Sequence, residues 1–396
     1  GLSGGNGGFG SGGGGGGGSA LVGGAGGTGG FGGGGGGGGG RTLGFSGQPG
    51  GTGGFGGGAG AQGVASAAAG GGGGAGLGGA IFANSGSLTL TNTTIRNNSA
   101  VGGQGGISGF LSAPGSNGQG MGGALFVNTG TSLNLASNII SGNSAANFGG
   151  GIFNSGTLTV NSSTLSGNNS TNSYGGGIYN VGTATVSNST FSNNLAPTFN
   201  LGGGGIANDN SGTLAVTNST FVGNSAYNGG GILNLSGSST INNSTFTDNS
   251  ATFGGGLYIL FDTLTINSST ISGNSAVFGG GIFKNIGTLT LGNSIVANNT
   301  ATSSSPDVLG NIISQGNNII LDPTGGSGFV SSDLLNVDPR LAPLGDYGGP
   351  TQTMALLPGS PAINGGGTGA TANDQRGVPA VGVRDIGAYE SAGFLL

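Results

Sequence analysis

The chain has 396 residues, of which 105 are glycine, and only 4% are charged, with a net charge of −5 at pH 7. Cys, His and Trp are absent, which excludes disulfides and metal sites built on Cys or His, and no cofactor is expected. The sequence has no basic patch for nucleic acid and no apolar run long enough for a transmembrane helix.

Residues 1–75 form a glycine-rich head in which a short motif recurs. The sequences GGNGGFG (4–10) and GGTGGFG (26–32 and 50–56) place Phe9, Phe31 and Phe55 at steps of 22 and 24 residues. Three interpretations are open: glycine-rich coils that continue the repeat that follows, a bundle of extended polyglycine strands, or a flexible linker. The regular spacing favours the first, because it is close to the length of the repeat in the body.

Residues 76–335 contain a repeat of about 25 residues that begins with a glycine cluster and an aliphatic residue. The aliphatic landmark recurs as Ile81, Leu125, Ile152, Ile178, Ile206, Ile232, Leu257 and Ile282. Apolar residues alternate with polar ones, as in Thr157-Leu158-Thr159-Val160, which is the pattern of a strand. Each repeat offers about three short strands, so the pattern predicts an all-β, right-handed parallel β-helix, a solenoid of stacked coils. A Gly-, Ser- and Pro-rich insertion at roughly 101–120 is expected to form loops.

Equivalent residues of stacked coils would form vertical rows. One apolar row is predicted at Leu90, Leu135, Val160, Val186, Val216, Ile241, Ile266 and Leu291. A second is predicted at Ile95, Ile140, Leu165, Phe191, Phe221, Phe246, Ile271 and Val296. A ladder of hydrogen-bonded side-chain amides is predicted at Asn98, Asn143, Asn168, Asn194, Asn224, Asn249, Asn274 and Asn299.

Threonines on the outer side of one strand are the candidate binding residues. They form two rows, predicted at Thr157, Thr159, Thr183, Thr185, Thr263, Thr265, Thr288 and Thr290. Such rows resemble the flat Thr-x-Thr surface of ice-binding solenoids. Thr also suits any exposed strand, and breaks at Asn134, Ala215 and Ser238 favour that simpler explanation.

The repeats resemble those of the polymorphic outer-membrane proteins, a family of surface adhesins with a β-helical passenger. Gly78-Gly79-Ala80-Ile81 matches the first motif of that family, GGAI. The second motif, FxxN, is matched by 191–194, 221–224 and 246–249. The resemblance covers about residues 76–300 and implies a β-helix with an adhesive role.

Residues 336–396 have a more ordinary composition and resemble a second family, the choice-of-anchor Q module. The matching segments are NVDPR (336–340), LGDYGGPT (344–351), LLPGSPAI (356–363), DQRG (374–377) and DIGAYE (385–390). This resemblance implies a bacterial, secreted and surface-associated protein. The segment is expected to form an irregular cap over the open end of the β-helix, with its Arg, Asp and Glu residues in ion pairs.

The body offers little for catalysis. Its only acidic residues are Asp209, Asp248 and Asp262, with Asp209 and Asp262 two coils apart, and its only basic residues are Arg96 and Lys284. No enzymatic activity, catalytic residue or metal site is therefore expected. The sequence predicts an extracellular structural protein, either a surface adhesin or a self-assembling fibre subunit, whose partners are sibling chains, glycans or matrix surfaces. The alternatives are an ice-binding surface and a β-helix that binds or degrades polysaccharides.

Overall fold

The computed structural model describes residues 2–9, 11–17, 22–40, 47–64, 67–108 and 113–391. These residues form strands and irregular backbone, and none of them belongs to a helix that could cross a membrane. Two compact units are present. The first comprises Gly1–Phe82, Asn98–Phe126 and Ala145–Phe148, and the second comprises Ala83–Asn97, Val127–Ser144 and Gly149–Leu396.

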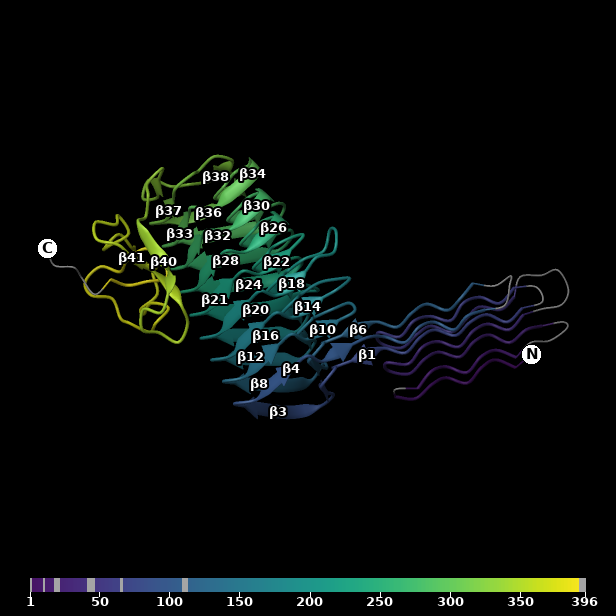
Figure 1. The fold of residues 1–396 in the computed structure, drawn as a ribbon. Helices are drawn as coiled ribbons and strands as arrows, with labels where there is room; N and C mark the ends of the chain where they lie inside the picture. The colour runs from purple at the N-terminus through teal and green to yellow at the C-terminus, as the bar shows by residue number, and fades with distance from the viewer. Residues whose placement is uncertain are drawn as a thin grey trace. The chain divides into compact units, whose positions relative to one another are not determined.

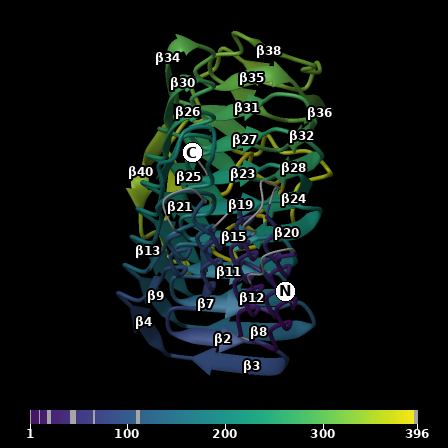
Figure 2. The same ribbon diagram turned by 90° about the vertical axis from the view of Figure 1, so that its right-hand side faces the viewer.

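The second unit is a parallel β-helix whose successive coils stack strand on strand, as the repeat predicted (Figures 1 and 2). Each coil has four strands rather than the three expected, because the Ser-Ala pair after each ladder asparagine also pairs with the next coil. The turns between strands use residues with a left-handed backbone, such as Asn188 and Asn218, with φ of 49° and 52°. Asn tolerates this conformation better than most residues, which explains its frequency in the repeat.

The strands of the second unit form four sheets, numbered here in the order in which each coil meets them. The first sheet contains β11 (Ile152–Asn154), β15 (Ile178–Asn180), β19 (Ile206–Asn208), β23 (Ile232–Asn234), β27 (Leu257–Ile259), β31 (Ile282–Lys284), β35 (Val308–Asn311) and β38 (Gly326–Ser327). The second contains β3 (Gly86–Thr91), β8 (Thr131–Ala136), β12 (Thr157–Asn161), β16 (Thr183–Ser187), β20 (Gly212–Thr217), β24 (Gly237–Asn242), β28 (Thr263–Asn267), β32 (Thr288–Gly292) and β36 (Ile313–Gly316).

The third sheet contains β4 (Thr94–Arg96), β9 (Ile139–Ser141), β13 (Thr164–Ser166), β17 (Thr190–Ser192), β21 (Thr220–Val222), β25 (Thr245–Thr247), β29 (Thr270–Ser272), β33 (Ile295–Ala297), β37 (Ile319–Ile320) and β39 (Leu334–Leu335). The fourth contains β14 (Asn169–Ser170), β18 (Leu195–Ala196), β22 (Ser225–Ala226), β26 (Ser250–Phe253), β30 (Ser275–Phe278) and β34 (Thr300–Ser304). Four further strands occupy the matching places of the first two coils, at the sequence borders of the units: β2 (Ile81–Ala83), β5 (Ser99–Ala100), β7 (Leu125–Val127) and β10 (Ser144–Ala145).

The core of the β-helix consists of the two apolar rows that the sequence predicted. Val160 lies opposite Val186, and Leu165 lies opposite Phe191, in the strand register. In the second row, the rings of Phe191, Phe221 and Phe246 stack with centroids 4.7 and 4.6 Å apart. All three rings are fully buried. A coil of this length cannot bury such side chains alone, so the rows hold neighbouring coils together.

The C-terminal segment, residues 336–391, is irregular apart from one antiparallel pair, β40 (Leu341–Gly345) with β41 (Thr353–Leu356). It lies along the flank of the β-helix, on the outer side of the third sheet, rather than across the open end as expected (Figure 1). Leu356, Ala362 and Ile386 pack against Ile295 and Ile319 of that sheet. The physical reason is that Ile replaces the outward Thr of earlier coils at these two positions, which creates an apolar strip that needs cover.

The first unit is built around extended polyglycine segments that run side by side (Figure 1). Backbone N–H groups of every third residue point to the same neighbour: those of Gly24, Gly27 and Gly30 donate to the carbonyls of Gly17, Gly14 and Ser11. This period of three is typical of a polyproline II helix, which has three residues per turn. The arrangement corresponds to the second of the three interpretations of the head, extended polyglycine strands, and not to coils like those of the body.

Glycine is required inside this bundle because its segments touch through their backbones. A Cβ atom on Gly36 would lie 2.0 Å from the carbonyl oxygen of Gly14, and one on Gly51 would lie 1.8 Å from that of Gly27. The insertion after residue 100 joins the bundle, since Gly103 and Gly106 donate to Gly74 and Gly71, rather than forming loops. One parallel pair follows, β1 (Gly76–Leu77) with β6 (Gly120–Met121).

The recurring phenylalanines mark the turns of the bundle. The N–H groups of Ser11, Gly33 and Gly57 donate to Gly8, Gly30 and Gly54, which closes a four-residue turn around each ring. Gly32 and Gly56, with φ of 76° and 71°, occupy the turn position that favours glycine. The steps of 22 and 24 residues therefore measure one outward and one returning segment, not one coil of a β-helix.

Candidate binding face

The outer side of the second sheet carries the candidate threonines in two rows. Strand alternation points Leu158 and Val160 into the core and leaves Thr157 exposed and Thr159 half-buried on the outside. In the strand register Thr157 lies opposite Thr183 and Thr159 opposite Thr185. The same holds for Thr263 with Thr288 and for Thr265 with Thr290. The structure therefore brings the eight threonines together as two blocks of four.

Intervening coils connect the two blocks. The first row reads Ser87, Ser132, Thr157, Thr183, Thr213, Ser238, Thr263 and Thr288. The second row reads Thr89, Asn134, Thr159, Thr185, Ala215, Thr240, Thr265 and Thr290. The first row thus keeps a hydroxyl in every coil, including Ser238, whose Oγ lies 3.3 Å from Oγ1 of Thr263. Only the second row is interrupted, at Asn134 and Ala215.

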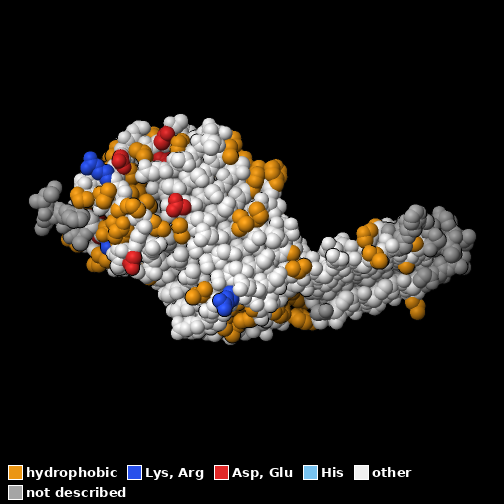
Figure 3. Space-filling model, in the orientation of Figure 1, with side chains coloured by type: hydrophobic (Ala, Val, Ile, Leu, Met, Phe, Trp, Pro, Cys, Tyr) orange, Lys and Arg blue, Asp and Glu red, His pale blue; other side chains and the backbone are white. Residues whose placement is uncertain are grey.

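The two rows form a regular lattice without a charged side chain. Neighbouring coils lie about 4.8 Å apart, and residues two apart in a strand are separated by about 6.6 Å. Each hydroxyl can both donate and accept a hydrogen bond. The charged side chains visible in Figure 3 instead gather mostly over the C-terminal segment. The outer side of the second sheet therefore suits a neutral ligand that repeats its own polar groups.

The predicted asparagine ladder lies inside the β-helix and supports the coils. From Asn143 to Asn299 each side-chain amide donates to Oδ1 of the next asparagine, with N–O distances between 2.8 and 3.0 Å. The backbone N–H of Asn143 donates to the same oxygen of Asn168, and this second bond recurs along the ladder. Asn98 holds the corresponding position of the first coil, within the first unit, and is half-buried.

Two further ladders were not predicted. The hydroxyl of Ser163 accepts from the N–H of Asn138, and the same bond continues along the serines at the turn before the third sheet. The serines of that ladder are Ser163, Ser189, Ser219, Ser244, Ser269 and Ser294. A third ladder joins Asn154, Asn180, Asn208 and Asn234. The signal for the serine ladder was present in the repeated Asn-Ser-Thr motif, whose Ser keeps the same place in successive coils.

The carboxylates of the body are not arranged as a catalytic pair. Asp209 accepts hydrogen bonds from the hydroxyls of Tyr179 and Ser236, at 2.8 and 2.6 Å, and from the N–H of Asn210. Burial, and then the charge of Asp209, raise the pKa of Tyr179, so the phenol stays protonated. Asp262 stands at the same corner two coils away and is exposed. Asp209 thus anchors a corner of the coil.

The charged residues of the C-terminal segment form buried ion pairs, as expected. Arg376 contacts Asp374 at 2.7 Å, and Arg384 contacts Glu390 at 2.6 Å. The guanidinium of Arg376 also lies 3.8 Å from the ring centre of Tyr389. These pairs are consumed by the internal contacts of an irregular segment. Among the described residues, no group of three or more His, Cys, Asp or Glu side chains could hold a metal ion.

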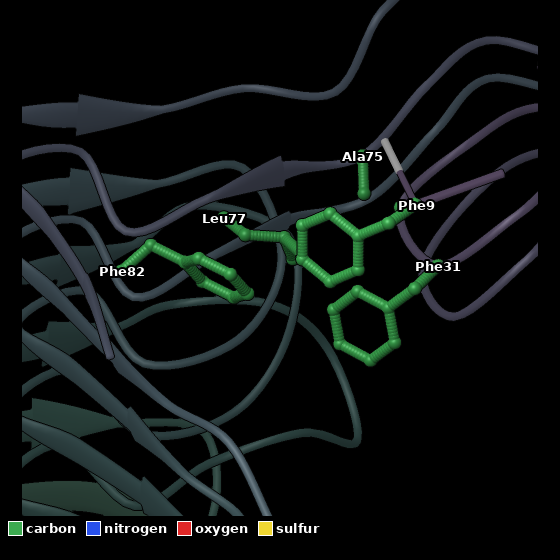
Figure 4. Close-up of a pocket in the computed structure, with 6 residues that line it drawn as sticks. Phe9, Phe31, Ala75, Leu77 and Phe82 are labelled. Carbon is green, nitrogen blue, oxygen red and sulfur yellow. The ribbon is translucent and has the colours of Figure 1, made fainter. Parts of the chain in front are cut away.

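An apolar pocket lies within the first unit. Phe9, Phe31, Ala75, Leu77 and Phe82 line a hollow of about 220 Å³, with Gly32 at its wall (Figure 4). The rings of Phe9 and Phe31 are parallel and 5.3 Å apart, and Phe31 stacks in the same way on Phe55. The lining has no charged side chain, so this pocket differs in chemistry from the hydroxyl rows.

Comparison with known proteins adds no relative to this description. No protein-family model matches the chain, and no curated protein has a similar sequence.

Proposed function

We propose that this chain is a non-enzymatic extracellular structural protein whose β-helix serves as a surface adhesin. The observation that carries the proposal is the uncharged lattice of hydroxyls on the outer side of the second sheet. A neutral polysaccharide offers hydroxyls at regular intervals that can pair with those of Thr157, Thr183 and their neighbours. Each contact is weak, but contacts made by successive coils to one long ligand add up.

The proposed location at a bacterial surface rests on two resemblances in the sequence. The repeats resemble polymorphic outer-membrane proteins through motifs such as Gly78–Ile81. Residues 336–390 resemble the choice-of-anchor Q module of secreted proteins. An extracellular setting is also compatible with a fold held by amide ladders and apolar rows, since neither requires a metal or a reducing environment.

An ice-binding surface is the second candidate, favoured by one feature of the same lattice. The first row has a hydroxyl in every coil from Ser87 to Thr288, and its spacing is fixed by the backbone. The interruptions at Asn134 and Ala215 in the second row speak against a surface that must match a crystal. Thermal hysteresis and shaped ice crystals in a solution of the purified protein would favour this candidate over adhesion.

Binding to a panel of immobilised polysaccharides tests the proposed adhesin. Cellulose, chitin and dextran serve as neutral ligands, and alginate and polygalacturonate serve as acidic ones. We expect retention on at least one neutral polymer that persists at high salt, because no ion pair contributes. Retention only on the acidic polymers, loss of binding in salt, or release of shortened sugars would contradict the proposal.

A further inference from the structure

The first coil of the second unit leaves strand edges without a neighbour. Among the described residues, β3 pairs only with β8 and β4 only with β9, so both strands stand at the end of their sheets (Figure 1). The core is also incomplete there: Leu88 and Leu90 of β3 are half-buried. In the next coil, the equivalent Leu133 and Leu135 are each only 1% exposed.

The hydrogen-bond pattern identifies the groups at this edge. Thr183 donates its N–H to Gly156 of the preceding coil, and Thr213 donates to Gly182 in the same way. Ser87 holds the equivalent position of β3, for which the second unit has no preceding coil. Because alternate residues of a parallel strand face the same side, the N–H groups of Ser87, Thr89 and Thr91 point away from β8. The edge therefore offers regularly spaced donors and the acceptors between them.

Nothing in the sequence of β3 protects this edge. Its residues, GSLTLT, include no charge and no proline, which are the usual means of blocking edge-to-edge pairing. The opposite end of the β-helix differs. There β38 and β39 have two residues each, and the pairing of β36 with β32 shifts register after Leu291. Only the N-terminal edge is both long and regular.

We infer that the N-terminal coil edge is an interface with a second copy of this chain, paired edge to edge through β3. Its complement is a coil edge of the same kind, because coil-on-coil contact already holds the rest of the β-helix together. With the C-terminal edge blunted, the two copies meet N-terminal edge to N-terminal edge. Twofold symmetry then runs the two β3 strands antiparallel and covers Leu88 and Leu90 of both copies. This interface does not depend on the proposed adhesion, although a dimer would double the number of hydroxyl rows offered to a ligand.

Sedimentation of the full chain over a wide concentration range tests this interface. Thr89→Pro removes a donor from the open side of β3 and leaves the groups that face β8 unchanged. Thr89→Lys places a charge beside the edge, and Thr159→Lys is its matched control, because Thr159 stands in the same row in the middle of the body. Circular dichroism of each variant checks that the β-helix still folds.

The wild-type chain is expected to form dimers that dissociate on dilution. Both Thr89 variants should raise the dissociation constant by at least about tenfold, a change that corresponds to about 1.4 kcal/mol, whereas Thr159→Lys should leave it within about twofold. A strictly monomeric wild type, growth into filaments, or equal weakening by Thr159→Lys and Thr89→Lys would overturn the inference.

Discussion

Asn299 donates both its backbone N–H and its side-chain amide to Oδ1 of Asp307, at 3.3 and 2.9 Å. Every earlier member of this ladder donates to an asparagine, so the last acceptor is a carboxylate. Oδ2 of Asp307 accepts from the N–H of Asp322. The serine ladder ends similarly, since Asn318 donates to Asp333. A carboxylate suits the last rung because it accepts from the coil below without an amide proton that needs a partner above.

Removing one rung of the ladder should destabilise the whole β-helix. Asn224 accepts two hydrogen bonds from Asn194 and donates to Asn249 and to the carbonyl of Phe191. Asn224→Ala leaves these buried groups without partners, at an expected loss of about 2–4 kcal/mol in the free energy of unfolding. Denaturant titration measures this loss. The exposed Asn172→Ala is the control and should stay within about 0.5 kcal/mol; equal losses would refute the role of the ladder.

The end of the ladder should make stability depend on pH. Burial raises the pKa of the Asp307 carboxyl to about 6, although three N–H donors oppose the shift. The folded state therefore holds the proton more tightly than the unfolded state, whose pKa is about 3.9. This contribution, at most about 3 kcal/mol, is fully present below about pH 4 and is lost as the pH rises through about 6.

Unfolding midpoints measured between pH 3 and pH 8 test this dependence. The variant Asp307→Asn, which cannot titrate, should show a smaller fall in stability across the window from about pH 4 to about pH 6. Asp385, whose pKa burial also raises, acts in the same direction and remains in the variant. An unchanged pH profile in Asp307→Asn would show that Asp307 does not carry the effect.

The stacked phenylalanines should matter more than any exposed aromatic residue. Phe221 lies between Phe191 and Phe246 and is fully buried, so Phe221→Ala leaves a cavity that its neighbours cannot fill. We expect a loss of about 3–5 kcal/mol in unfolding free energy, measured by denaturant titration. Phe261, which is 43% exposed, is the matched control. A smaller loss for Phe221→Ala than for Phe261→Ala would contradict the stacked core.

The polyglycine bundle should tolerate alanine only where its backbone is open. Gly36→Ala would place a methyl group 2.0 Å from the Gly14 carbonyl oxygen, whereas Gly5 has nothing within 4 Å of the corresponding position. Limited proteolysis of the full chain should therefore cleave the first unit of Gly36→Ala faster than that of the wild type. Gly5→Ala should be cleaved at the wild-type rate or more slowly. Identical cleavage of both variants would mean that the segments do not pack as described.

The sequence predicted the parts of the fold that depend on repetition. Leu158 and Val160 alternate with threonine in a pattern that only a strand explains, and the constant step between ladder asparagines predicted their stacking. The fourth strand was missed because Ser-Ala is too short and too small to show a period. The glycine head was hard to interpret because Phe9, Phe31 and Phe55 give a spacing close to that of a coil, while the period of three lies in backbone bonds without side chains.

The C-terminal segment and the candidate face show where local patterns stop being informative. Ile295 and Ile319 break the outward threonine pattern of the third sheet, which was the available sign that this flank is covered. The contact of Gln375 with Thr245 joins residues 130 positions apart, and no periodicity predicts it. For the hydroxyl rows, alternation predicted which threonines point outward, but the continuity supplied by Thr213 and Thr240 emerged only from the strand register.

The hydroxyl lattice of the second sheet is the centre of this account, and one affinity measurement tests it most directly. The variant that combines Thr183→Val with Thr185→Val removes two exposed hydroxyls and keeps the shape of the strand, and Thr164→Val on the third sheet is its control. Affinity for the neutral polysaccharide that retains the wild type should fall by about tenfold or more in the double variant and stay unchanged in the control. Equal affinity in all three proteins would contradict binding through this face.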